Sequence, residues 1–334
     1  MSARRAELTR AAARYLDGER PEQFTSCRRS ARAGTVVPVH AVLVVNPFAT
    51  RVSEQRLTTV EAELRRVVDL TVVRTDRRSH ATELVKEACR AGCEAVIVFS
   101  GDGGFNEALN GLAADVPIGF IPGGGTSVLP RALGLPADPV AAVRRLAEAI
   151  EQGRTRRITL GRVNGRRFAF NAGLGLDAAA VRRVDEMGRR EDGKRPGDLA
   201  FALAVVRVLA AHRGRLEPTL ELKGIGRAAF VFVANASPYT YAKWIPLPIT
   251  PEAEFELGLD FVAPVHVRRR SLVRLATLLL MGHPRSGPVL YGHDVDRLEV
   301  VCDHPMPLHV DGEDLGDVES AVFEAERSVV SVFV

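Results

Sequence analysis

Cysteine is scarce in this chain of 334 residues, which contains only four. Cys89 and Cys93 lie one turn apart on a predicted helix, but no histidine pair accompanies them at the spacing of a zinc site. We therefore expect no zinc ligands here, and instead buried, reduced thiols of the kind found in cytosolic proteins.

Long apolar runs are also missing. No window reaches the roughly 18 uninterrupted apolar residues that a membrane span requires, and Met1 to Ala33 lack the apolar core of a signal peptide. The positive excess is small, because 45 Lys and Arg against 41 Asp and Glu give a net charge of +4. We therefore expect a cytoplasmic protein without a nucleic-acid partner, which contacts anionic membrane surfaces peripherally. The sequence leaves open whether the chain forms a homodimer.

Apolar strands and amphipathic helices alternate through the first half of the chain. Four short apolar runs predict strands at 41–45, 69–73, 95–99 and 117–121. Ser53 can cap a helix after the first strand, and Ser79 can cap another after the second. The order βαβαβαβ predicts an α/β domain with a doubly wound parallel sheet.

Two glycine-rich turns follow the third and fourth predicted strands. In the first, three glycines surround Asp102 and a helix is predicted from Asn106, whereas the second turn spans residues 122–127. The first turn has neither the sequence of a P-loop nor the spacing of a Rossmann motif. Parallel strands end at one edge of a sheet, so the turns would meet there and favour phosphate. A tight connection without a ligand is the alternative.

The pattern changes in the second half, where short alternating runs predict antiparallel strands. We therefore expect three parts: a partly mobile extension over 1–37, the α/β domain over 38–155, and a β-rich sandwich domain over 156–327.

Two helices and one loop are expected within the β-rich part. The apolar helix 199–212 either packs on the sheet or faces lipid. The helix 268–281, basic at its start, either docks on an anionic bilayer or ends in solvent. The charged segment 182–194 is predicted to be an exposed loop.

Four motifs occur in a fixed order along the chain. They are Asn46-Pro47-Phe48-Ala49-Thr50, the run from Ser100 to Glu107, the run from Pro122 to Ser127, and Asp311-Gly312-Glu313. In this order they resemble the motifs of the diacylglycerol kinase and sphingosine kinase superfamily of lipid kinases, which is related in fold to the NAD kinases. The resemblance implies an ATP site between the two domains. It also implies that the last strand, 328–334, returns to the first domain.

The resemblance further implies transfer of the γ-phosphate of ATP to the hydroxyl of a lipid substrate, such as diacylglycerol or a sphingoid base, with Mg²⁺. It makes Glu313 the general base, includes Asp311 in the catalytic set, and places Asp102 near the metal and the phosphates. The sphingosine kinases suggest Asp102 as the base instead. The implied nucleotide contacts are Asn46, Pro47, Thr75, Ser100, Gly101, Gly103, Gly104, Asn106, Glu107, Gly124, Gly125 and Thr126.

Several positions depart from the family pattern. Gly104 replaces a threonine, Thr50 a glycine and Ser127 an asparagine. Each change alters a hydrogen-bonding group near the implied phosphates, so one alternative is a catalytically impaired regulator that binds nucleotide or lipid. Another alternative is an NAD-kinase-like enzyme with a soluble acceptor, against which the Asp311-Gly312-Glu313 motif argues.

Overall fold

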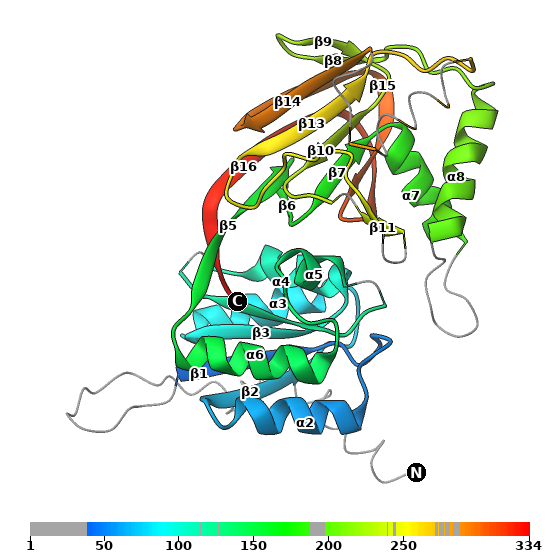
Figure 1. Ribbon diagram of the computed structural model, residues 1–334. Helices are drawn as coiled ribbons and strands as arrows, with labels where there is room; N and C mark the ends of the chain where they lie inside the picture. The colour runs from blue at the N-terminus through cyan, green and yellow to red at the C-terminus, as the bar shows by residue number, and fades with distance from the viewer. Residues whose placement is uncertain are drawn as a thin grey trace, which may run out of the picture.

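The computed structural model describes residues 39–113, 115–125, 127–187, 198–238, 240–242, 245–270, 273, 277, 281–282 and 288–334. The predicted N-terminal extension, Thr126 and most of the predicted helix 268–281 therefore lie outside the described residues. Figure 1 shows two lobes, and the described chain both begins and ends in the same one.

The first lobe is a parallel sheet flanked by helices (Figure 1). Its strands are β1 (Val39–Val45), β2 (Val68–Arg74), β3 (Ala95–Ser100) and β4 (Ile118–Pro122), in the order β4-β3-β1-β2. Its helices are α2 (Glu54–Leu64), α3 (His80–Arg90), α4 (Asp102–Gly111), α5 (Val128–Ala132) and α6 (Pro139–Glu151). The predicted doubly wound arrangement is confirmed, and the carboxyl ends of all four strands lie at one edge.

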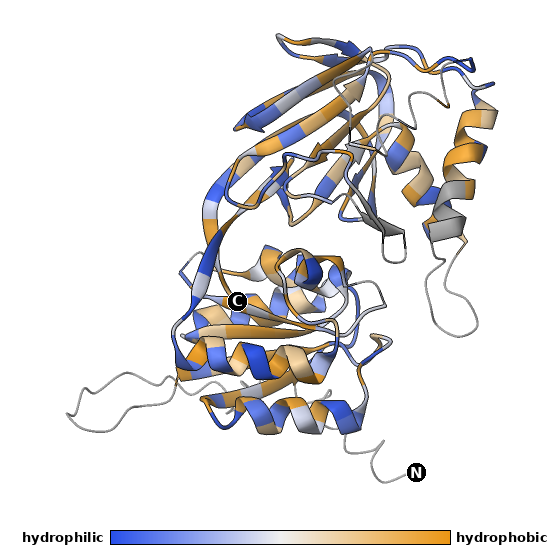
Figure 2. Ribbon diagram, viewed as in Figure 1, coloured by the Kyte–Doolittle hydropathy of each residue, from blue (hydrophilic) through white to orange (hydrophobic). Residues whose placement is uncertain are grey.

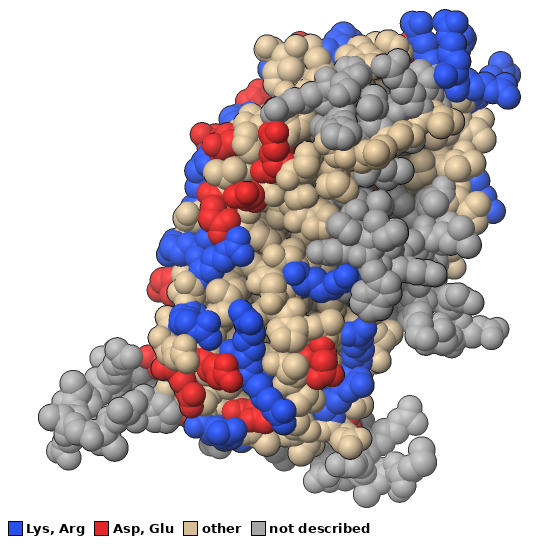
Figure 3. Space-filling view, in the orientation of Figure 1, with Lys and Arg blue, Asp and Glu red and all other residues tan. Residues whose placement is uncertain are grey.

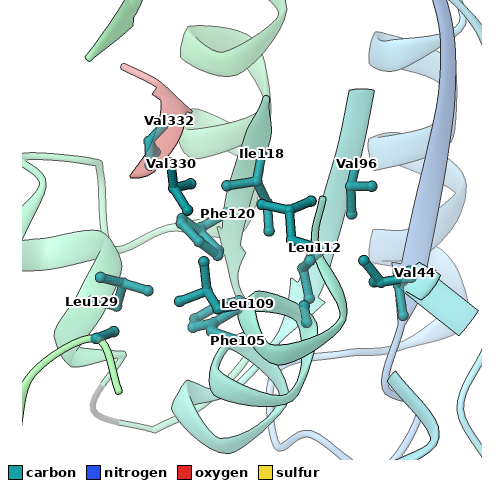
Figure 4. Close-up of a cluster of buried hydrophobic side chains, with 14 of the residues drawn as sticks. Val44, Val96, Phe105, Leu109, Leu112, Ile118, Phe120, Leu129, Val330 and Val332 are labelled. Atoms are coloured by element: carbon teal, nitrogen blue, oxygen red, sulfur yellow. The ribbon is translucent and has the colours of Figure 1, made fainter. Parts of the chain in front are cut away.

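Apolar side chains hold the helices against this sheet. Figure 4 shows one cluster, in which Phe105 and Leu109 of α4 lie beside Phe120 of β4. The rings of Phe105 and Phe120 pack edge to face with centroids 5.1 Å apart. Val330 and Val332 belong to the same cluster. The end of the chain is therefore part of the first lobe's core.

The N-terminus of α3 is capped by a different residue from the predicted one. Ser53 caps α2 as predicted, because its Oγ accepts the N–H of Arg56 at 3.3 Å. The prediction for Ser79 is wrong: this residue has a φ of 62° and makes no capping hydrogen bond. The carboxylate of Glu107, on α4, accepts the N–H groups of Ser79 and Ala81 instead, at 2.9 and 3.2 Å.

The second lobe consists mainly of antiparallel strands, as the alternating runs predict. They are β5 (Thr155–Val163), β6 (Arg166–Phe168), β7 (Asn171–Leu174), β8 (Leu220–Leu222), β9 (Gly226–Ala228), β10 (Val231–Ala234), β11 (Thr240–Ala242), β12 (Ile245–Leu247), β13 (Leu259–Pro264), β14 (Val289–Val295), β15 (Arg297–Val310) and β16 (Glu313–Phe333). Strands of both lobes share one hydrogen-bonded path, β14-β13-β10-β7-β15-β16-β4-β3-β1-β2.

Strand β16 joins the two lobes. Its end pairs in parallel with β4, where Val332 lies opposite Ile118, so the predicted return of the last strand is confirmed. The strand is longer than predicted, because it begins at Glu313 and runs antiparallel to β5 for much of its length. A bulge around Ser328, which has a φ of 49°, interrupts the ladder. Such a bulge bends a strand pair, and β16 curves between the lobes in Figure 1.

Two helices, α7 (Leu176–Glu186) and α8 (Asp198–Ala211), lie at one side of the second lobe (Figure 1). The loop predicted over 182–194 is wrong at its start, which belongs to α7, and residues 188–197 lie outside the described part of the chain. The predicted helix 199–212 is confirmed as α8.

Much of helix α8 is coloured as hydrophobic in Figure 2. Ala204, Val208 and Leu209 are buried, and Ala204 packs against α7. Leu203 and Val206 remain 47% and 60% exposed. The helix therefore packs on its neighbours and still presents apolar side chains to the outside. Across the described residues, no helix is both long and apolar enough to cross a membrane.

Three of the four cysteines are described, and all three are free thiols. Cys93 and Cys302 are buried as expected, whereas Cys89 is only partly buried. A hydrogen bond from Cys93 lowers the pKa of Cys89 to about 6, whereas burial raises the pKa of Cys302 to about 11. Cys89 is thus the thiol with the most thiolate character of the three.

Candidate active site

The first glycine turn forms the first turn of helix α4. Strand β3 ends at Ser100, Gly101 is extended, and the helix begins at Asp102. The predicted start at Asn106 is therefore one turn too late. The N–H groups of a first helical turn have no acceptor within the helix, so they are available to an anion.

The second glycine turn lies directly against the first. The N–H of Gly123 donates to the carbonyl oxygen of Ser100 at 2.6 Å. A Cβ added to Gly124 would lie 2.9 Å from the Cα of Gly101, so a side chain there would separate the two turns. The predicted meeting of the turns at one edge of the sheet is confirmed.

Asn46 and Thr75 follow β1 and β2 at this same edge. The Oδ1 of Asn46 accepts the N–H of Phe48 at 3.0 Å, which closes a turn around Pro47. The N–H of Thr75 donates to Val45 at 2.9 Å, and its side chain is buried. Both residues therefore have fixed positions at the edge that carries the glycine turns.

Asp102 links the first turn of α4 to the short helix α5. Its carboxylate accepts the N–H of Leu129, at 3.1 Å, and that of Val128. Burial raises the pKa of Asp102, the two N–H groups oppose this rise, and the charge of Asp311 adds to it. A carboxylate in this setting favours a cation beside it.

The carboxylate of Asp311 is occupied by four hydrogen-bond donors. Oδ1 accepts the N–H groups of Phe170 and Asn171 at 2.9 and 3.0 Å. Oδ2 accepts the N–H of Ala169 and the side-chain amide of Asn106, both at 2.8 Å. Four donors use the acceptor capacity of two carboxylate oxygens. Because Asn106 belongs to α4, Asp311 ties the second lobe to the first.

Asn106 extends this network to Glu313. Its Oδ1 accepts a hydrogen bond from Nη2 of Arg166 at 2.9 Å, and the same nitrogen lies 3.0 Å from a carboxylate oxygen of Glu313. Asp311 and Gly312 have φ values of 46° and 77°, so a tight left-handed turn precedes Glu313. The side chain of Glu313 is 46% exposed and can still meet a ligand.

Sequence comparisons match both lobes. Residues 40–163 match the diacylglycerol kinase catalytic domain, and residues 171–334 match the YegS C-terminal NAD kinase beta sandwich-like domain. The chain belongs to the diacylglycerol kinase family of lipid kinases. Its family resemblance and its identification as a lipid kinase are therefore confirmed.

Individual relatives agree with this identification. A diacylglycerol kinase of Bacillus subtilis (strain 168) is 28% identical over 248 residues, which cover 70% of this chain and 75% of the relative. One from Mycobacterium tuberculosis (strain ATCC 25618 / H37Rv) is 37% identical over 114 residues, or 32% and 36% of the two chains. The fold resembles the crystal structure of a diacylglycerol kinase from Bacillus anthracis str. Sterne, with a TM-score of 0.68 at 20% identity. That match covers 90% of this chain and 98% of the other.

The lipid kinase brings most of the predicted site residues to one region, from both lobes. Asn46, Pro47, Thr75, Ser100, Gly101, Asp102, Gly103, Gly104, Gly124 and Gly125 lie at the carboxyl edge of the parallel sheet. Asp311 and Glu313 join it through Asn106. Glu107 points instead to the start of α3, and Thr126 lies outside the described residues.

Sequence reasoning missed the arginines of β6. Arg166 contacts both Asn106 and Glu313. Nε of Arg167 lies 2.6 Å from Glu326 on β16, and its Nη1 donates to Leu109 in the last turn of α4. Two consecutive arginines on a short strand form no recognisable motif. Their role in connecting α4 to Glu313 and Glu326 becomes visible only from their contacts in the structure.

Sequence reasoning also missed a buried pair formed by a histidine and an aspartate. His309 and Asp177 are 1% and 2% exposed and are hydrogen-bonded to each other. A Cβ at Gly173 would lie 2.5 Å from the His309 ring, so glycine is required between them. Asp177 follows the glycine-containing run that begins at Asn171, and this run is a local signal that could have identified it. No signal in the sequence identifies His309.

The glycine turns and Asp102 fit a nucleotide that carries its own magnesium ion. A Cβ at Gly103 or Gly125 would meet no atom within 4 Å, so space for phosphate is open there. Mg²⁺ commonly binds one or two carboxylates together with phosphate oxygens and water. Asp102 can supply one such carboxylate, whereas the oxygens of Asp311 are already occupied. Within the described ranges, no three acidic, histidine or cysteine side chains cluster as a metal cage.

Proposed function

We propose that this kinase transfers the γ-phosphate of ATP to the hydroxyl of a lipid such as diacylglycerol or a sphingoid base. The observation that carries the proposal is the chain of contacts from Asp311 through Asn106 and Arg166 to Glu313. These contacts hold an acidic side chain of the second lobe beside α4, the helix whose first turn is the proposed phosphate-binding turn. Phosphoryl transfer needs both groups in one place.

Glu313 is the proposed general base. It is partly exposed, and Arg166 fixes its orientation. As the acceptor oxygen bonds to the γ-phosphorus, its proton passes to Glu313 and ADP leaves with the electrons of the broken P–O bond. Asp102 is the proposed ligand of the magnesium ion, which neutralises phosphate charge when bound.

An assay of phosphate transfer tests this proposal. The protein is incubated with γ-labelled ATP, Mg²⁺ and either diacylglycerol, sphingosine, ceramide or NAD. We expect label in at least one lipid, and a loss of about 100-fold or more in Glu313→Gln and Asp102→Asn. Glu151→Gln, at the exposed end of α6, is the matched control and should retain activity.

The other outcomes separate the alternatives. Label in NAD alone would favour an NAD-kinase-like enzyme, and ATP binding without transfer to any acceptor would favour a regulator. A fully active Glu313→Gln or Asp102→Asn protein would remove the role proposed for that residue.

We further propose that the outer face of α8 docks on an anionic membrane, where the lipid acceptor resides. Leu203 and Val206 provide exposed apolar side chains. Two backbone hydrogen bonds between Leu216 and Val267, of 3.0 and 2.9 Å, bring the chain after α8 beside the segment that precedes Arg268. The exposed arginines of these two segments are Arg213, Arg215, Arg268, Arg269 and Arg270. Figure 3 shows Lys and Arg side chains gathered at the upper right, above α8 in the view of Figure 1. Apolar and basic side chains together favour an anionic lipid surface.

A further inference from the structure

The end of helix α3 brings two cysteines together. The helix ends at Arg90. Gly92, which has a φ of 85°, then turns the chain back, so that the N–H of Cys93 donates to the carbonyl oxygen of Ala88 at 3.1 Å. A left-handed glycine of this kind closes many helices. The thiol of Cys93 forms a hydrogen bond with the sulfur of Cys89, so two free thiols are in contact at the end of the helix.

The two thiols differ in exposure and in charge. Cys93 is 5% exposed, whereas Cys89 is only partly buried. The hydrogen bond from Cys93 and a second one from the N–H of Ala113 lower the pKa of Cys89 to about 6, although burial and the charge of Asp115 oppose them. The contact with Cys89 and burial raise the pKa of Cys93. Because the thiolate is the form of cysteine that reacts, Cys89 is the nucleophile of the pair.

The pair suits redox chemistry better than metal binding. A structural zinc site has four ligands, and the pair supplies two. Across the part of the chain that the structure describes, no third acidic, histidine or cysteine side chain joins them as a metal site. A thiolate that touches a second thiol has instead what a reversible oxidation requires, which is a reactive sulfur and a resolving cysteine beside it.

We propose that Cys89 and Cys93 are a peroxide-sensitive dithiol, in which Cys89 is oxidised first and Cys93 converts it to a disulfide. The Cys89 thiolate attacks one oxygen of hydrogen peroxide, the O–O bond breaks, and hydroxide leaves with its electron pair, which gives a sulfenic acid. The sulfur of Cys93 then attacks that of Cys89. The S–S bond forms as the S–O bond breaks, and the departing oxygen takes the thiol proton of Cys93 and leaves as water. The two cysteines lose two electrons, and peroxide is reduced to water and hydroxide.

Peptide mapping by mass spectrometry tests the proposal. The measurement uses the full chain with Cys27→Ser, because Cys27 lies outside the described residues and is a further thiol in the assay. Arg90 lies between the two cysteines, so trypsin releases them on separate peptides, which a disulfide would hold together. A brief treatment with hydrogen peroxide at pH 7 should join these peptides, and dithiothreitol should separate them again.

Cys302 is the internal control. Burial raises its pKa to about 11, so it should stay reduced during the same treatment. In the untreated protein at pH 7, iodoacetamide should label Cys89 at least about tenfold faster than Cys302, since the thiolate is the nucleophile.

Two variants separate the roles of the cysteines. Cys93→Ala should stop the reaction at the sulfenic acid of Cys89, which dimedone traps, whereas Cys89→Ala should leave Cys93 reduced. The peptide cross-link requires neither variant, so it decides the question even where a variant fails to fold. Oxidation of Cys302 as fast as that of Cys89, or oxidation of Cys89 without a cross-link to Cys93, would overturn the proposal. None of these measurements uses kinase activity, so failure of the proposed function would leave their result unchanged.

Discussion

Among single residues, the three acidic side chains of the site differ in what their oxygens already contact. Asp311 accepts four N–H donors, Asp102 accepts two backbone N–H groups, and Glu313 contacts Arg166. The sequence identifies all three, because acidic residues next to glycines stand out. No local pattern shows that the oxygens of Asp311 are occupied, because its donors lie 140 to 205 positions away along the chain. The contacts occupy the oxygens of Asp311, and we therefore propose the chemical roles for Asp102 and Glu313.

Asp102→Asn should stabilise the protein at pH 7 while it abolishes transfer. The fold raises the pKa of Asp102, mainly by burial, above its ordinary value of 3.8. The folded protein therefore holds this proton more tightly than the unfolded chain, and it loses stability as the pH rises through that range. Asparagine does not titrate and keeps an oxygen for the N–H of Leu129. Urea unfolding between pH 3 and pH 8 should show an advantage of the variant that grows above about pH 4.

The matched control for this pH series is Asp69→Asn, at an exposed position of β2. It should show no advantage that grows with pH. An Asp102→Asn protein that is less stable than wild type by the same amount at every pH would contradict the burial argument.

At the scale of helices and strands, apolar patterning predicts the first lobe well. Buried parallel strands such as β3 are apolar throughout and end abruptly in glycine, so their ends and their common edge can be predicted from the sequence. The start of α4 could not be predicted in this way. Three glycines indicate a loop, although two of them lie in the first turn of the helix and the third caps it. The cap of α3 could not be predicted either, because the acceptor of its N–H groups is Glu107 on another helix.

Glu107→Ala should destabilise the protein by about 1 kcal/mol, as loss of a helix cap does. Its carboxylate accepts two N–H groups at the start of α3, where negative charge is also favoured by the helix dipole. Urea unfolding measures this loss, and Glu107→Gln should lose less, because it keeps one acceptor oxygen. The outcome that would contradict a purely structural role is different. If Glu107→Ala keeps its stability but binds Mg²⁺-ATP more weakly in calorimetry, the nucleotide contact that the family motif implies would be supported.

At the scale of the whole molecule, the site depends on two lobes that are joined by more than one connection. β16 runs from Glu313 to the core of the first lobe, alongside β5. Glu326 of β16 pairs with Arg162 and Arg167, and Arg167 reaches the last turn of α4. The return of the chain end could be expected from the family resemblance. The ion pairs of Glu326 could not be expected, because they join residues about 160 positions apart along the chain and no local pattern indicates them.

The surface formed by α8 and the neighbouring arginines leads to a prediction about vesicle binding. The protein should cosediment with vesicles that contain phosphatidylglycerol and not with neutral phosphatidylcholine vesicles, and added salt should weaken this binding. Leu203→Asp/Val206→Asp should abolish it, because the apolar contact is replaced by negative charge. Arg213→Gln/Arg215→Gln should weaken it about tenfold or more, since each basic residue near an anionic surface contributes about 1 kcal/mol.

Ile225→Asp, at an exposed apolar position between β8 and β9, is the matched control and should bind as wild type does. Equal binding by the α8 variant and the wild type would show that the apolar face of α8 is not the docking surface.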